Sequence, residues 1–178
     1  YGWAFAAEMA AVIALQYGGL GWDDAQMLTL CAALRAAHAG GGLRKLETLR
    51  LFNNQMGDGA AAALAALLEE GAMPKLKVLN LSDNQIGDDG VIALAKAITP
   101  DESGKGGLAQ LTGLYLHKNQ IGDAGVTALA KAITESGRGA LANLTMLGLG
   151  GNKIGDPGCT ALAEAVDSGA LANLNALS

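Results

Sequence analysis

Four aspartates at regular spacing are the residues of this sequence that most invite a chemical role, because a row of carboxylates can bind calcium or transfer protons. They stand 30, 35 and 33 residues apart, so each brings one carboxylate to its own part of the chain. Calcium needs about six to eight oxygen ligands around one ion, which this spacing does not gather. We therefore predict that they are helix N-caps, and Pro157 after the last one supports this. They are Asp58, Asp88, Asp123 and Asp156.

The remaining candidates for catalysis lack partners at motif spacing. Neither His38 nor His117 has a serine or cysteine at a distance typical of a catalytic motif. The sequence contains no GxxxxGK[ST] phosphate loop, and the GKGG stretch at 104–107 is interpreted as a flexible connector. Metal ligands of the CxxC or HxxxH type are absent. We predict a chain that is not an enzyme and that uses no cofactor and no metal.

Charge and cysteine content narrow the class of protein. The net charge is −5, and the basic residues are scattered, so we expect no nucleic-acid partner. Cys31 and Cys159 are far apart and make no disulfide framework, which favours an intracellular setting, cytoplasmic or organellar. Cys159 occupies a position held by valine in similar stretches, so we expect it in the core.

Internal repeats organise the chain. Stretches starting at Leu46, Leu76, Leu111 and Leu144 read LETLRLFNNQMGD, LKVLNLSDNQIGD, LTGLYLHKNQIGD and LTMLGLGGNKIGD. Each is followed by an apolar run with helical periodicity. Such repeats are typical of a solenoid, in which each unit buries its apolar face against its neighbours. The chain starts at Tyr1 and ends within LANLNALS, the opening of another copy, so we expect a piece of a longer protein.

Each copy predicts a short strand, a turn and a helix. Leucines that alternate, such as Leu79 and Leu81, point to one face of a strand. The asparagine that follows ends the strand, and its carboxamide can satisfy backbone groups of the turn. We therefore predict a structural role for Asn54, Asn84, Asn119 and Asn152.

The pattern LxxLxLxxN in these four copies resembles the leucine-rich repeat family. The following NxIGDxG and the helical run resemble the ribonuclease-inhibitor-like subclass, which also supplies repeat domains of nucleotide-binding innate-immune receptors. The resemblance implies an α/β solenoid with a parallel β-sheet on the concave side and α-helices on the convex side. It divides the chain into a degenerate N-terminal repeat or cap at 1–42 and leucine-rich repeats at 43–178, four clear copies plus the start of a further one.

Residues 1–22 permit three interpretations. Aligning Ile13, Leu15 and Gly18 with the leucines and asparagine of a clear copy predicts a degenerate first repeat, in which Leu20 and Leu28 also take core positions. The segment is apolar enough for a membrane-spanning or interfacial role. The third interpretation is a capping helix at 3–14. Membrane contact is expected only through residues 1–22.

Function is expected on the strand residues that alternate with the leucines, because they face the concave side. Arginine and aromatic residues dominate interface energetics, so we predict a partner surface made of Arg50, Phe52, Asp83, Tyr115, His117 and Lys118. The alternative is that these are ordinary solvated strand residues. Gly148, Gly150 and Gly151 indicate either a close approach to this backbone or divergence of the last copy.

The resemblance to leucine-rich repeat proteins, which commonly bind other proteins, implies a non-catalytic scaffold or recognition domain. Its expected partner is another protein or a multi-protein assembly. One alternative is a structural or peripheral subunit that docks through its apolar N-terminus or convex face. The other is a regulatory domain of a larger receptor or enzyme.

Overall fold

The computed structural model describes residues 8–99, 108–135 and 141–178, so the connector predicted at 104–107 lies outside the described residues. Strands and helices alternate along the chain, which confirms the α/β solenoid. The strands are β1 (Ala14–Gln16), β2 (Thr48–Arg50), β3 (Val78–Asn80), β4 (Gly113–Tyr115), β5 (Met146–Gly148) and β6 (Ala176–Leu177). The helices are α2 (Asp24–Ala39), α3 (Asp58–Glu69), α4 (Asp88–Ile98), α5 (Asp123–Glu135) and α6 (Asp156–Asp167).

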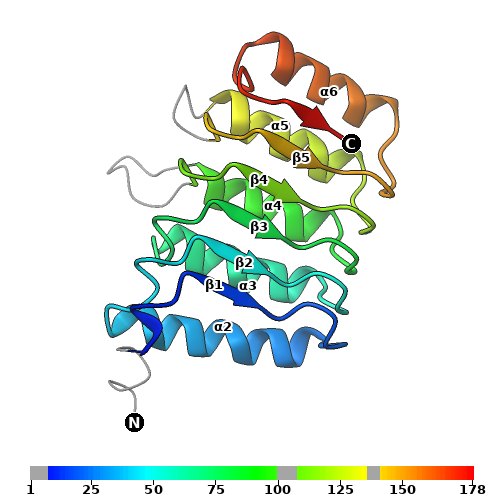
Figure 1. Ribbon diagram of the computed structural model, residues 1–178. Helices are drawn as coiled ribbons and strands as arrows, with labels where there is room; N and C mark the ends of the chain where they lie inside the picture. The colour runs from blue at the N-terminus through cyan, green and yellow to red at the C-terminus, as the bar shows by residue number, and fades with distance from the viewer. Residues whose placement is uncertain (1–7, 100–107, 136–140) are drawn as a thin grey trace.

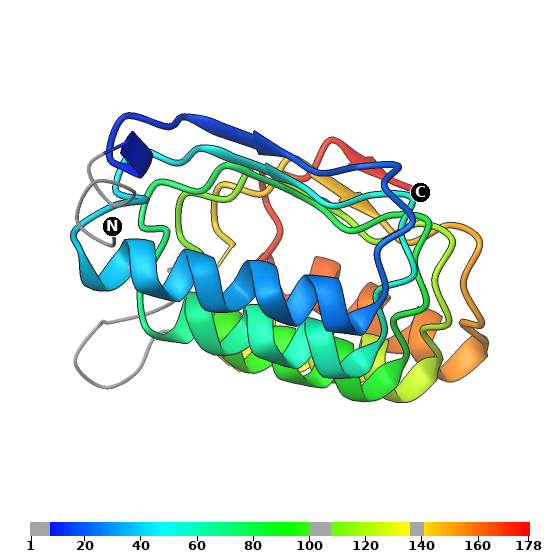
Figure 2. The ribbon, with the colours of Figure 1, turned by 90° about the horizontal axis from the view of Figure 1, so that it is seen from below.

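The molecule has two layers. The strands form one parallel sheet in the order β1 to β6, and the helices lie side by side against one face of it (Figures 1 and 2). No described helix covers the other face, which we call the open face and which is the face predicted to be concave. Every strand therefore has one side in the core and one side available to a partner.

The core lies between the sheet and the helices. The strand register places the first leucine of each repeat beside that of its neighbours, so they form a row across the sheet. A second row follows two residues later on the same face, as the period of a strand requires. The buried rows are Leu49, Leu79, Leu114 and Leu147, and Leu51, Leu81, Leu116 and Leu149.

The N-terminal segment adds strand β1 and helix α2 to these layers. Its alignment with the later repeats differs from the predicted alignment by two residues. Leu15 pairs with Leu49, so it takes the first leucine position and Leu20, not Gly18, occupies the asparagine position. The predicted core residues Ile13, Leu20 and Leu28 are 58%, 50% and 46% exposed. A shift of two residues keeps the same side chains on the same strand face, so alternation alone did not fix the register.

Other features of this segment fix the start of α2. Asp23 is its N-cap: its side chain accepts from Ala25 N and Gln26 N, and the side chain of Gln26 accepts from Asp23 N, which completes a capping box. The predicted capping helix at 3–14 is wrong at its C-terminal end, because Ala14 begins β1, and its first residues lie outside the described ones. In the described parts of the chain no helix has the length and apolarity needed to cross a membrane.

The two cysteines differ in burial. Cys31 is buried against the core, and this burial raises the pKa of its thiol to about 11, with the Arg35 guanidinium acting in the opposite direction. Cys159 is exposed, so its predicted core position is wrong. The valines at its position in α4 and α5, Val91 and Val126, are fully buried. Those helices have a neighbour on both sides, whereas α6 packs against α5 alone within the described chain.

Candidate protein-interaction surface

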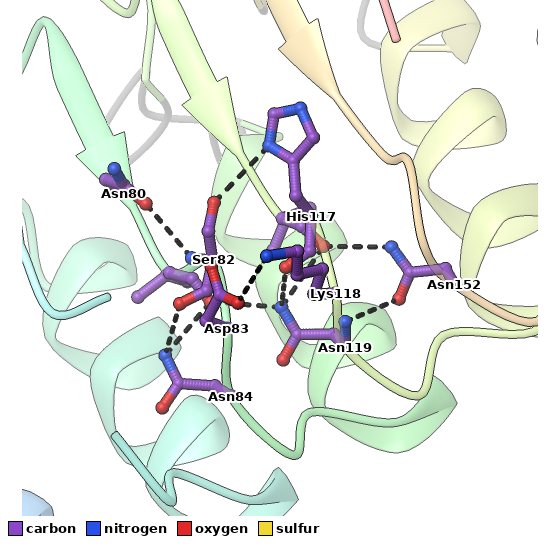
Figure 3. Close-up of polar contacts among 10 residues, drawn as sticks. Asn80, Ser82, Asp83, Asn84, His117, Lys118, Asn119 and Asn152 are labelled. Atoms are coloured by element: carbon purple, nitrogen blue, oxygen red, sulfur yellow. Dashed lines mark hydrogen bonds and ion pairs between the residues drawn. The ribbon is translucent and has the colours of Figure 1, made fainter. Parts of the chain in front are cut away.

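Asparagine side chains hold the strand ends together from one repeat to the next. Asn84 Nδ2 donates to the carbonyls of Leu51 and Leu81, both at 3.0 Å, and Asn84 Oδ1 accepts from Met56 N at 3.0 Å. Asn119 makes the equivalent bonds one repeat later (Figure 3). Asn54 and Asn152 also bridge two repeats. These bonds use both ends of each carboxamide, so the asparagines serve the scaffold rather than a ligand.

The aspartates cap helices, but not their own, so the predicted N-cap role is wrong. Gly57, Gly87 and Gly155 are the N-caps of α3, α4 and α6, and each aspartate is the first helical residue. The Oδ1 atom of Asp58 instead accepts from Gly87 N at 2.6 Å and Gly90 N at 3.0 Å, in the next repeat. The reason is the lateral stacking of the helices, which brings each aspartate to the N-terminus of its neighbour.

The same contact recurs along the solenoid. Asp88 Oδ1 accepts from Gly122 N and Gly125 N at 2.7 and 2.9 Å, and Asp123 Oδ1 accepts from the amides of Gly155 and Gly158. Asp156 accepts no such bond from a described residue. A Cβ at Gly125 would lie 2.7 Å from Asp88 Oδ1, so glycine leaves the space that the carboxylate needs. Within the described ranges, no group of three or more His, Cys, Asp or Glu residues is placed to hold a metal ion.

The open face carries side chains that differ from repeat to repeat. One row across the sheet contains Gln16, Arg50, Asn80, Tyr115 and Gly148. The backbone bonds that continue the sheet define a second row, which contains Phe52, Ser82, His117 and Gly150. All six predicted partner-surface residues therefore lie on or beside one face. Asn80 and Ser82 fill the gap between them. They follow the same alternation but were left out of the predicted partner surface, because neither residue type is typical of interface anchors.

Three ring side chains lie directly against glycine backbone. A Cβ at Gly18 would come within 2.5 Å of the Phe52 ring, and one at Gly113 within 2.8 Å of the Tyr115 ring. A Cβ at Gly148 would collide with the ring of His117. The close approach expected at the last copy is therefore made by the chain's own His117. Packing against backbone fixes where these rings lie on the open face.

The polar groups around these rings are mostly paired. His117 Nδ1 lies 3.4 Å from Ser82 Oγ, its Nε2 lies 2.9 Å from Ser178 Oγ, and its ring stacks on Tyr115 at 6.1 Å (Figure 3 shows the Ser82 contact). The Nζ atom of Lys118 lies 3.2 Å from Asp83 Oδ1. The structure thus brings Asp83, Tyr115, His117 and Lys118 together on neighbouring repeats. Arg50 at the end of β2 and Phe52 two residues beyond it lie on the repeat before them.

Several solved structures are similar to this chain. The actin-binding site 2 of leiomodin-1 superposes with a TM-score of 0.64 at 16% identity, covering 95% of this chain and 84% of that one. An internalin from Listeria monocytogenes gives 0.46 at 25% identity, covering 79% of this chain and 30% of that one. The BIR3–SERK2 complex from Arabidopsis thaliana gives 0.41 at 17% identity, with 79% and 56% covered. Our chain thus spans less than a third of that internalin, and the leiomodin likeness shows the fold alone.

A search of curated proteins finds no match to this sequence. A profile of the family described as leucine-rich repeat matches residues 42–65, 72–95, 111–130 and 140–163, which together make up more than half of the chain. These segments contain the strands β2 to β5 and the first part of the helix that follows each of them. The chain therefore belongs to the leucine-rich repeat family.

Proposed function

We propose that this chain is a non-catalytic recognition domain that binds a partner protein through its open face. Leucine-rich repeat domains generally mediate protein–protein interaction and are typically not catalytic. The observation that carries the proposal is the set of anchor residues on this face: Arg50, Phe52, Tyr115 and His117, three of them rings held against glycine backbone. Phe52, on a sheet face that no described helix covers, is 38% exposed.

Such an arrangement favours binding for an energetic reason. Ordering a mobile side chain at an interface costs about 0.5–1.5 kcal/mol. Rings already fixed against glycine lose little further freedom when a partner covers them, so more of the burial energy remains as affinity. Arginine and aromatic residues near the centre of an interface also supply most of its binding energy.

The proposal also includes the repeat subclass and the cellular location. The layer of regular α-helices, of 11 to 16 residues each, supports the ribonuclease-inhibitor-like subclass. Two cysteines that form no disulfide with each other, one buried and one exposed, support an intracellular location.

A second candidate is a structural subunit that docks through its N-terminal repeat. The observation in its favour is the exposure of three large apolar residues of that repeat, Ile13, Leu20 and Leu28. Exposed apolar surface often marks a contact with another molecule. Ile13 precedes β1, Leu20 lies between β1 and α2, and Leu28 lies on α2, whereas Tyr115 and His117 belong to the repeat of β4.

An affinity pull-down from the native cell extract, read by mass spectrometry, tests the two candidates against each other. One variant carries Arg50→Ala, Phe52→Ala and Tyr115→Ala. The matched control variant carries Ile13→Ala, Leu20→Ala and Leu28→Ala. We expect specific partners to be lost with the open-face variant and retained with the control. Retention with the open-face variant and loss with the control would reject the open face and favour the structural-subunit role.

A further inference from the structure

We propose that Arg50 and Asn80 form a carboxylate-binding site on the open face, and that the partner segment docking there presents an aspartate or glutamate side chain. The inference rests on the proposed recognition function and adds the chemistry of the group that is recognised. The two residues are register neighbours on β2 and β3, so their side chains leave the same face side by side.

The positive charge of Arg50 has no partner among the described residues. Within the described chain its guanidinium makes no hydrogen bond and no ion pair. By contrast, two lysines close to the strands are paired with carboxylates: Lys118 Nζ lies 3.2 Å from Asp83 Oδ1, and Lys77 Nζ lies 3.0 Å from Glu47 Oε1. The strand neighbours of Arg50 are Gln16 and Asn80, neither of them acidic. Arg50 is thus a positive charge whose counter-ion must come from outside the described chain.

The side chain of Asn80 is oriented by a hydrogen bond within its own repeat. Its Oδ1 atom accepts from Ser82 N at 3.0 Å, which directs the oxygen along its own strand (Figure 3). No described residue accepts from its Nδ2 group. A guanidinium and an amide NH2 group are both pure donors here, so the complementary ligand is an acceptor without donors. A carboxylate fits this description, and arginine binds it in a two-pronged geometry.

The open-face residues next to Arg50 and Asn80 determine which side chains can flank the bound carboxylate. Phe52 follows Arg50 by two residues on the same face, and Val78 precedes Asn80 by two, so one apolar side chain lies diagonally on each side of the pair. The polar residues Thr48 and Ser82 occupy the other two diagonal positions. The carboxylates that make the chain acidic do not compete for Arg50. Asp58, for example, lies at a helix N-terminus, where it accepts from Gly87 N and Gly90 N. An acidic side chain fits the pair itself, and an aliphatic residue next to it in the partner segment can contact Phe52 or Val78.

Peptide titrations followed by NMR test this site directly. The probes are three peptides acetylated and amidated at their ends, Leu-Glu-Leu, Leu-Gln-Leu and Leu-Lys-Leu, so the only carboxylate is the glutamate side chain. The readouts are the side-chain Nε–Hε signal of Arg50 and the Nδ2 signals of Asn80. We expect saturable shifts with the glutamate peptide and about tenfold weaker binding of the glutamine peptide, because a charge-assisted hydrogen bond is replaced by a neutral one.

Three variants complete the test. Arg50→Gln should weaken binding of the glutamate peptide about tenfold, and Asn80→Ala about threefold. Lys77→Gln, which removes a paired cation directly before β3, should leave it unchanged. Equal binding of the glutamate and glutamine peptides, a preference for lysine, or no shift of Arg50 with any peptide would overturn the carboxylate site. The pull-down result is independent of these titrations, so a partner lost with the open-face variant would preserve the recognition function even if the peptides reject the site.

Discussion

The two faces of the sheet differ in how their residues change from repeat to repeat. On the helix side the same types recur at each position: leucine at Leu49, Leu79, Leu114 and Leu147. On the open face the corresponding row reads Gln16, Arg50, Asn80, Tyr115 and Gly148, with no type repeated. Positions that recur build the scaffold, and positions that vary are free to carry recognition. Paired substitutions, one on each face, test whether the two faces have these separate roles.

The largest effect on stability is expected in the leucine rows. Leu79→Ala should lower the free energy of unfolding by about 2–5 kcal/mol, because a fully enclosed side chain leaves a cavity between the sheet and the helices. Val78→Ala, next to it but on the open face, should cost less because Val78 is only partly buried. Urea denaturation followed by circular dichroism measures both. Equal losses at the two positions would contradict the division between the faces.

The next largest effect is expected for the asparagines at the strand ends. Asn84→Ala leaves the Leu51 and Leu81 carbonyls and the Met56 amide without their side-chain partner. Each unpaired buried group costs about 1–3 kcal/mol, so we expect a loss near the upper end of that range. The comparison is Asn80→Ala on the open face, which loses one partly buried hydrogen bond from Ser82 N and should cost only about 0.5–1.5 kcal/mol. The same urea titrations compare the two variants.

A smaller effect is expected for the aspartate that caps its neighbour's helix. Asp88→Ala removes two hydrogen bonds to the start of α5 and should cost about 1–2 kcal/mol. Asp89, the next residue in the same helical turn, is exposed, and its side chain makes no hydrogen bond to a described residue, so Asp89→Ala should be close to neutral. Hydrogen exchange should show the loss at the N-terminus of α5 rather than of α4. Faster exchange confined to α4 would reject capping between repeats.

The smallest effect on stability at neutral pH is expected from the ionisation of the buried Cys31 thiol. Because burial raises the pKa of Cys31 from 9.0 to about 11, the folded protein holds this proton more tightly than the unfolded chain. The resulting stabilisation is complete below pH 9 and is lost as the pH rises toward 11. The stability difference between wild type and Cys31→Ala should therefore shrink over this range. A thiol reagent at neutral pH should modify Cys159 in the folded protein and Cys31 only after unfolding.

The sequence predicted the scaffold well where positions recur. The leucines, the helix layer and the single parallel sheet all follow from four similar copies. The N-terminal register was two residues wrong, because alternation with a period of two does not distinguish Leu15 in the first leucine position from Leu15 in the second. The role of Asp58 was missed because it depends on a helix 29 residues later in the chain lying alongside.

The candidate surface was predictable in part. The faces of Arg50, Phe52 and Tyr115 follow from strand periodicity. The packing of His117 on Gly148 and the pairing of Lys118 with Asp83 depend on which strands are neighbours and on side-chain reach. The absence of a counter-ion for Arg50 among the described residues depends on the same geometry, so composition alone did not single out Arg50 and Asn80 as a pair.

The most direct test of the account is to measure affinity and stability on one variant. The variant carries Arg50→Ala, Phe52→Ala and Tyr115→Ala, and its partner is the one recovered by the wild type. Calorimetric titration should show at least about a hundredfold loss of affinity, because anchor residues carry most of the binding energy. Thermal unfolding should show that the variant remains folded at the assay temperature. A folded variant that binds its partner within twofold of wild type would contradict the assignment of recognition to the open face.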